Sequence, residues 1–146
     1  MTIVERIAKR ISEIFPDVTI YSERQKSGFE VPSFYISKIM TITKNRFFDI
    51  QDRHLSYSIT YFANPDQPNA DMEEVEQKLL NNLTRLDDYA TVRNREITIN
   101  QDDETLVMSF DLRLEMYPVE DGGKLERIEF NGGLQEDGNR DSGGQN

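Results

Sequence analysis

The sequence predicts an α+β fold: a two-layer sandwich in which two α-helices cover one face of a mainly antiparallel or mixed β-sheet. Two segments place apolar residues at the three-four spacing of an amphipathic helix, and several others alternate apolar and polar residues as strands do. Their order is helix, short strand, two strands, helix, two strands. Because strands adjacent in sequence tend to pair, and each apolar helix stripe needs a surface to cover, this order favours one sheet with both helices on the same face.

The first helix is expected over residues 2–15. Thr2 and Glu5 have the spacing of a capping box, and Pro16 would end the helix. A short strand is expected at residues 18–21, and the polar residues that follow connect it to the next strand. The apolar stripe of the helix consists of Ile3, Val4, Ile7, Ile11, Ile14 and Phe15.

Two strands are expected in the middle of the chain. In the first, Phe34, Ile36, Met40 and Ile42 alternate with polar residues, with Lys38 interrupting the apolar side. In the second, Leu55, Tyr57, Ile59 and Tyr61 alternate with Ser and Thr. The charged segment 44–53 between them is either a hairpin tip or an extension of both strands. The breaker cluster 64–68 ends the second strand.

A second helix and two closing strands complete the predicted sheet. The helix is expected over about residues 71–86, with Asp71 and Glu74 as a cap pair and a stripe of Met72, Val75, Leu79, Leu83 and Leu86. Ile97 and Ile99 mark the next strand, and residues 100–104 form a hairpin turn. In the last strand, residues 106–116 have the cleanest period-2 alternation in the chain, which predicts a sheet with one buried and one solvated face.

Glycine placement divides the chain near residue 117. Seven of the eight glycines follow Pro118, and residues 118–146 hold seven acids and three bases but few apolar residues. Such a segment has too little apolar surface to offset the ~1–2 kcal/mol per residue that ordering a backbone costs. We therefore expect a folded body over residues 1–117 and an acidic, glycine-rich tail over residues 118–146 that is disordered in isolation. Within it, residues 125–130 could become ordered on a partner.

Composition and charge exclude several classes of protein. The 146 residues include 27 acids and 17 bases, a formal net charge of −10, which argues against a protein that grips nucleic-acid phosphates. The absence of cysteine excludes disulfide scaffolds, thiolate zinc sites and cysteine nucleophiles. No apolar run approaches the ~20 residues of a membrane span, and the first residues lack a signal-peptide pattern. We expect a soluble, acidic protein without a membrane partner.

Few side chains could support catalysis or metal binding. His54 is the only histidine, and Asp52 shares its side of the predicted strand. Two ligands fall short of a metal site, and no second His or Cys is available. The acidic groups 87–88 and 102–104 occupy places where solvated acids are common, and the chain has no phosphate-binding glycine loop and no nucleophile elbow. The sequence therefore predicts no catalytic residue, no metal and no cofactor.

Exposed aromatic and basic residues fit a contact surface better. The segment 44–53 brings together Arg46, Phe47, Phe48 and Arg53, residue types that are enriched in protein–protein interfaces. The alternative is that Phe47 or Phe48 folds back into the core. The remaining expected contact residues are Phe29 and Phe130.

A set of short strings, in the order of the predicted elements, carries a resemblance to a known family. The strings are the helix end Phe15-Pro16, Val18-Thr-Ile-Tyr-Ser-Glu23, Gly28-Phe-Glu-Val-Pro-Ser-Phe34, Ser56-Tyr-Ser-Ile-Thr-Tyr-Phe62, Val75-Glu-Gln-Lys-Leu-Leu80 and Phe110-Asp-Leu-Arg-Leu-Glu-Met-Tyr117. Over residues 1–117 the chain resembles the tail terminator (tail completion) proteins of phages and phage-like particles of Gram-positive bacteria. The fold of that family, helices against a β-sheet, agrees with the predicted one.

The resemblance implies a structural virion protein and no enzymatic activity. Such proteins form a hexameric ring that caps the tail tube, stops its polymerisation and offers an interface to the head connector. The implied partners are further copies of the chain, the tail tube protein, the head connector or neck protein and, in contractile particles, the tail sheath. DNA would pass through the lumen without specific binding, and assembly would take place in the bacterial host cytoplasm.

Two alternatives remain at this stage, and an enzyme is the least favoured. One is another head–tail joining or neck protein, and the other is a monomeric, non-viral binding module. A closed ring joins two different patches of the same chain. The segment 44–53 and the open edge of the predicted sheet are the candidates for one side of that contact.

Overall fold

The computed structural model describes residues 1–118 and the backbone of residues 125–127. The chain divides into two compact units: Met1–Thr43 with Arg53–Arg113, and Lys44–Asp52 with the chain from Leu114 onward. Residues 119–124 and 128–146, most of the expected tail, lie outside the described residues. The expected boundary at residue 117 and the expected disorder of the tail therefore stay predictions.

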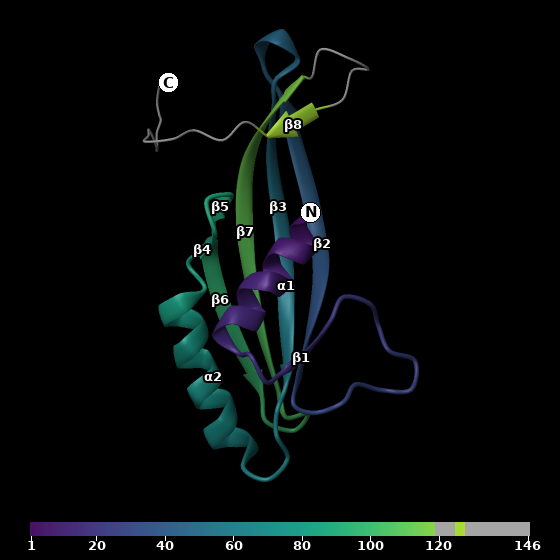
Figure 1. Cartoon of the computed structure of the whole chain (residues 1–146), viewed down its shortest axis with the longest axis vertical. Helices are drawn as coiled ribbons and strands as arrows, with labels where there is room; N and C mark the ends of the chain where they lie inside the picture. The colour runs from purple at the N-terminus through teal and green to yellow at the C-terminus, as the bar shows by residue number, and fades with distance from the viewer. Residues whose placement is uncertain (119–124, 128–146) are drawn as a thin grey trace. The chain divides into compact units, whose positions relative to one another are not determined.

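The described strands form one large sheet and one small hairpin (Figure 1). The large sheet has the order β1-β2-β3-β7-β6, with β8 paired to β7. β1 is parallel to β2, whereas β6 and β8 are antiparallel to β7. The elements are α1 (Ile3–Ile14), β1 (Thr19–Tyr21), β2 (Ser33–Asn45), the 3₁₀ turn η1 (Phe47–Asp49), β3 (Gln51–Phe62), α2 (Pro68–Asn82), β4 (Arg85–Leu86), β5 (Ala90–Thr91), β6 (Arg93–Asn100), β7 (Thr105–Pro118) and β8 (Leu125–Arg127).

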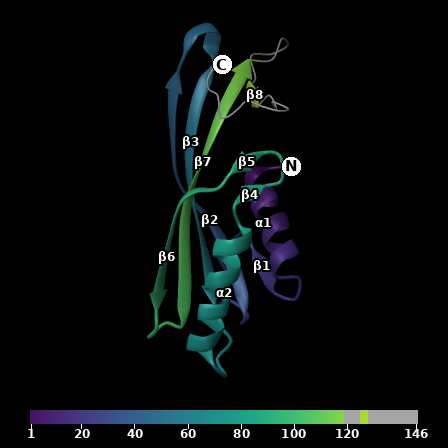
Figure 2. The same ribbon diagram turned by 90° about the vertical axis from the view of Figure 1, so that its left-hand side faces the viewer.

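Both helices pack on the same face of the sheet, which confirms the predicted α+β sandwich (Figure 2). The alternation predicted for the last strand is found in β7, where the even-numbered residues from Leu106 to Leu114 are buried and their neighbours are not. β3 alternates in the same way from Leu55 onward, with the odd-numbered residues buried. The fully buried side chains of this core include Ile7, Ile11, Phe34, Ile36, Ile59, Met72, Leu79, Leu106, Met108 and Phe110.

Among the described residues, no helix covers the opposite face of the sheet, and short polar side chains lie along its centre (Figure 2). Ser37 of β2 and Ser58 of β3 lie in hydrogen-bond contact, with 2.9 Å between their Oγ atoms. Ser56 Oγ donates to Asp111 Oδ1 of β7 at 2.8 Å, and Asn94 Nδ2 of β6 donates to Asp111 Oδ2 at 3.0 Å. Short polar side chains thus link four neighbouring strands across this face, as expected for a sheet with one wet side.

α1 confirms the predicted capping box. The Glu5 backbone N–H donates to Thr2 Oγ1 at 3.1 Å, and the Thr2 N–H donates to Glu5 Oε1 at 2.6 Å. These hydrogen bonds from Thr2 lower the pKa of Glu5. The helix ends at Ile14; the buried Phe15 and the exposed Pro16 follow it.

The predicted bounds and cap of the second helix are wrong. α2 begins at Pro68, because proline at the first helical position needs no hydrogen-bond acceptor and already has a helical φ. Asp71 therefore lies inside the first turn, where its Oδ2 accepts from the hydroxyl of Tyr61 at 2.6 Å and from the N–H of Asn64 at 2.9 Å. Burial and this hydrogen bond raise the pKa of Tyr61.

α2 also ends earlier than predicted, at Asn82, and an arginine from β6 satisfies its carboxyl end. Leu83 and Leu86 are buried as expected, but Leu86 belongs to β4 of a hairpin that the sequence did not predict. Arg95 Nη1 donates to the carbonyl oxygens of Leu79, Leu80 and Leu83 at 3.4, 2.9 and 3.3 Å. A cation at this end also interacts favourably with the helix dipole.

The apolar side of β2 is buried only over the first residues of the strand. Phe34 and Ile36 are buried, whereas Met40 and Ile42 are 49% and 45% exposed. On β6, Ile99 is also exposed. The two helices cover the centre of the sheet, so that apolar residues of β6 and of β2 beyond Ile36 lie partly in solvent (Figure 2).

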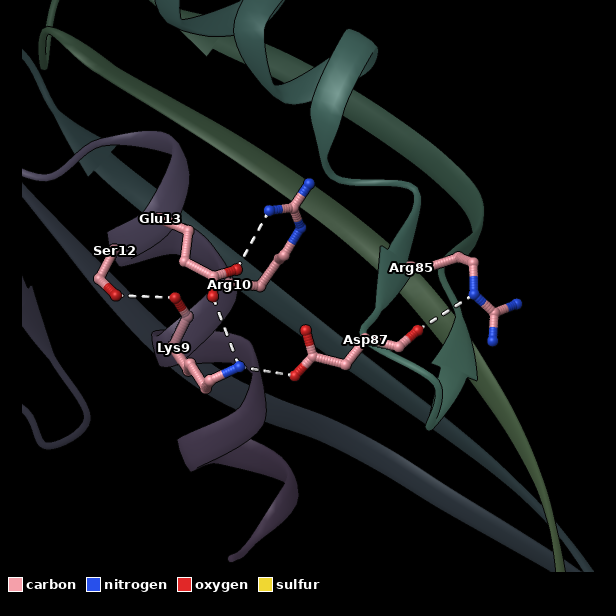
Figure 3. Close-up of polar contacts among 6 residues, drawn as sticks. All are labelled: Lys9, Arg10, Ser12, Glu13, Arg85 and Asp87. Carbon is pink, nitrogen blue, oxygen red and sulfur yellow. Dashed lines mark hydrogen bonds and ion pairs between the residues drawn. The ribbon is translucent and has the colours of Figure 1, made fainter. Parts of the chain in front are cut away.

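Charged side chains connect α1 to the β4–β5 hairpin (Figure 3). Lys9 Nζ lies 2.9 Å from Asp87 Oδ2 and 3.4 Å from Glu13 Oε2, and Arg85 Nε donates to the backbone carbonyl of Asp87 at 3.1 Å. The hydrogen bond between Lys9 and Asp87 raises the pKa of Lys9 and lowers that of Asp87. Its contribution to stability is therefore lost as the pH falls through the lowered pKa of Asp87, and as the pH rises through the raised pKa of Lys9.

The Arg95 contact predicts a stability difference between two arginines of one strand. Arg95→Met removes a charged donor from three carbonyl groups, so we expect it to lower the free energy of unfolding by about 1–3 kcal/mol. Arg93→Met, an exposed position two residues earlier, serves as the matched control and should change it by less than ~0.5 kcal/mol. Urea denaturation followed by circular dichroism measures both. Equal effects would show that the helix end does not depend on Arg95.

Candidate assembly surface

The turn at residues 46–50, between β2 and β3, carries the most exposed aromatic side chains of the described residues. The Arg46 N–H donates to the Ile50 carbonyl oxygen at 2.6 Å, and the Ile50 N–H donates to that of Phe47 at 3.2 Å. The segment 44–53 thus proves to be both an extension of the two strands and a tight turn. Phe48 and Asp49 both have a φ of 61°, a left-handed conformation that costs a non-glycine residue roughly 1–2 kcal/mol.

Phe47 and Phe48 point into solvent and do not fold back into the core. Their side chains are 86% and 88% exposed. Burying a phenylalanine is worth ~1.5–3 kcal/mol, and neither ring gains this within the described chain. Both rings are therefore unburied, and they lie on a turn whose backbone has a defined, left-handed conformation at Phe48. Such rings are the usual energetic centres of protein–protein contacts.

An ionic cluster lies at the base of the turn. Arg46 Nη1 is 3.3 Å from Asp52 Oδ1 and makes a second, shorter contact with Glu115 Oε2 of β7. The Tyr117 hydroxyl donates to the other oxygen of Glu115 at 2.9 Å. The hydrogen bond to Glu115, with the charge of Asp52, raises the pKa of Arg46, so that the guanidinium stays charged. Arg46 therefore holds the turn in place through contacts with residues of its own chain.

The other expected contact residues have different surroundings. Phe29 is half-buried: its ring stacks on Phe62 at a centroid distance of 4.5 Å, and it contacts Tyr21 and Tyr35 at 5.3 and 5.2 Å. Arg53 is half-buried and has an interaction within the structure. Phe130 lies outside the described residues. The structure thus places the exposed aromatic surface at Phe47 and Phe48.

The side chains considered for chemistry do not converge. Asp52 pairs with Arg46, while His54 is exposed on β3. Asp103 accepts a hydrogen bond from the side chain of Asn100 at 3.0 Å within the β6–β7 turn. Among residues 1–118, no group of three or more His, Asp or Glu side chains is arranged to hold a metal ion. No helix in this part of the chain is long and apolar enough to cross a membrane.

Two features of this surface were missed by sequence reasoning. Glu115 reaches Arg46 across 69 positions, and nothing local to either residue predicts the contact. The second feature is the exposure of Ile39, Met40 and Ile42, which alternation alone does not predict. A signal for it exists in the charge pattern, since residues 31–48 contain three bases and no acid in a chain of formal charge −10.

A comparison with protein families identifies the class of protein. A family model described as phage tail terminator protein matches residues 2–124 of the 146 residues. The chain therefore belongs to the phage tail terminator family, as its resemblance to these proteins predicted. Members of this family are structural virion proteins with a role in tail completion, and they associate with other tail or head components. A search of the curated proteins finds no match.

The exposure of the turn predicts that its phenylalanines contribute nothing to folding. The double variant Phe47→Ser, Phe48→Ser should retain the free energy of unfolding of the parent within ~0.5 kcal/mol, because both rings are already in solvent. Phe110→Ala, which empties a core position that is 1% exposed, should cost about 3–5 kcal/mol. Urea denaturation of the purified chains makes the comparison. A loss above ~1 kcal/mol in the double variant would mean that the rings pack within the chain.

Proposed function

We propose that this protein is the tail terminator of its particle: a hexameric ring that caps the tail tube, stops its polymerisation and provides the interface to the head connector. In a particle with a contractile tail, the same ring would also contact the sheath. The observation that carries the proposal is the family match over residues 2–124, which spans both helices and every strand through β7. The ring would be assembled in the host cytoplasm and retained in the virion.

The exposed turn supports an assembly role in particular. A ring subunit must contact its neighbours and at least one other protein, so part of its surface is apolar before assembly. Phe47 and Phe48 supply such a surface, and the contacts of Arg46 with Asp52 and Glu115 hold their turn in place. We assign these two rings to a contact with another subunit or with a neighbouring component of the tail or head.

Charge fits a conduit better than a DNA-binding protein. Six copies of a chain with formal charge −10 carry −60 in total. Acidic groups around a lumen would repel the DNA backbone, so that DNA would pass without being held.

Tail length in particles made without this gene tests the proposal. We expect overlong tubes of irregular length that lack heads, because nothing stops tube polymerisation. The parent gene should restore normal lengths, whereas the double variant Phe47→Ser, Phe48→Ser should fail to do so despite a normal fold. Val31→Ser, which changes an exposed apolar residue outside the turn, is the matched control and should restore them.

The other outcomes separate the alternatives. Tails of normal length that fail to join heads would assign the chain to head–tail joining instead. Unchanged, functional particles would exclude a role in assembly. Electron microscopy of negatively stained particles measures both length and head attachment.

A further inference from the structure

The outer edge of β2 is open along most of its length. β1 pairs with β2 only through the register Thr19↔Ser33 to Tyr21↔Tyr35, whereas β2 continues to Asn45. Among the residues that the structure describes, no strand pairs with this edge from residue 36 to residue 42. The backbone N–H and C=O groups of such an edge are a template for a further strand.

This edge has little of the protection that an exposed strand normally carries. Edge strands are usually short, or carry charges and proline that prevent pairing with another chain. Residues 36–42 contain a single charge, Lys38, and no proline. Ile39, Met40 and Ile42 are 58%, 49% and 45% exposed on the same stretch. A long, apolar, unpaired edge in a structural virion protein indicates that another strand covers it after assembly.

The second open edge of the sheet, at β6, also carries apolar residues. Among the described strands, β6 is the last in the sheet order and pairs with β7 alone. Ile97 and Ile99 lie opposite the buried Met108 and Leu106, so they belong to the face that the helices cover. By alternation from Phe34 and Ile36, Met40 and Ile42 belong to the same face. Pairing the β2 edge of one copy with the β6 edge of another would make this apolar face continuous across the two copies.

The strand directions allow this joining. β6 is antiparallel to β7. β2 and β3 are joined by the tight turn at residues 46–50, and β3 ends where β7 begins, with the Ala63 N–H donating to the Glu104 carbonyl oxygen at 3.0 Å. β2 and β7 therefore run one way, and β3 and β6 the other. A second copy placed beside the first in the same orientation brings its β6 against β2 as an antiparallel pair.

We propose that residues 36–42 of β2 in one copy pair with β6 of the next copy, so that a β-sheet runs on from subunit to subunit. The contact joins two different patches, as a closed ring requires, whereas pairing β2 with β2 would end at a dimer. This inference rests on the proposed ring and adds to it the two strands that form the subunit contact. The partner is thus a second copy of this chain.

Cross-linking in assembled particles tests the pairing. Ile39 of β2 and Glu96 of β6 are both exposed; Glu96 lies opposite Ser109 on the polar face, and alternation puts Ile39 on that face too. The contacts Ser37–Ser58 and Ser56–Asp111 place Glu96 at the level of Ser37, next to Ile39, when two copies lie side by side. The chain has no native cysteine, so Ile39→Cys and Glu96→Cys introduce the only thiols. Particles carrying the double variant are treated with a short bismaleimide, which tolerates a small shift in register. We expect a ladder of covalent multimers that ends at the hexamer.

The controls distinguish failure of this contact from failure of the ring. Each single-cysteine variant should remain monomeric on denaturing gels. A dimer from Ile39→Cys alone would show symmetric β2–β2 pairing, and a conjugate with a different tail protein, identified by mass spectrometry, would show another occupant. Either result overturns the inference. No ladder from particles whose tails end in a visible ring would also overturn it and leave the proposed function intact. Particles without any ring at the tail end would contradict the proposed function itself.

Discussion

Burial of the alternating apolar side chains of β3 and β7 under α1 and α2 is the interaction on which the rest of the fold depends. Leu106, Met108 and Phe110 of β7 are at most 1% exposed, and they face a helix layer that includes Ile7 and Leu79, both fully buried. At roughly 1.5–3 kcal/mol for each large side chain, this face supplies the main driving force for folding. The polar contacts around it, from the Thr2 cap to the Arg95 guanidinium, fix where the helices begin and end.

The two helices do not cover every strand of this sheet, and the uncovered parts share exposed apolar side chains. They are a strand edge at residues 36–42, the outer strand β6 and the aromatic turn at residues 46–50. The apolar residues of these regions stay partly or largely exposed within the described chain, and Phe48 also adopts a left-handed backbone conformation. In a family of structural virion proteins, surfaces of this kind are those that assembly would bury. The same sheet therefore provides the fold through its centre and contacts through its edges.

The sequence predicted most of the fold because most of its signals are local. The Thr2 cap and the alternation of β7 involve neighbouring residues and were confirmed. The start of α2 was misjudged because Asp71 resembles a cap residue, while the proline at position 68 was read only as a breaker. Exposure of Met40 could not be predicted, since periodicity shows which residues share a face but not how far the helices extend over it. The Arg46–Glu115 pair depends on tertiary structure alone.

Hydrogen–deuterium exchange, compared between the free chain and the assembled particle, tests most directly whether the uncovered regions are assembly contacts. In the free chain, peptides from residues 36–42 and 46–50 should exchange rapidly relative to the core of β7, because their outward backbone groups are exposed. In the particle, we expect strong protection of both regions. The core of β7 should be protected equally in both states. Unchanged, rapid exchange of both regions in the particle would contradict their assignment to assembly contacts.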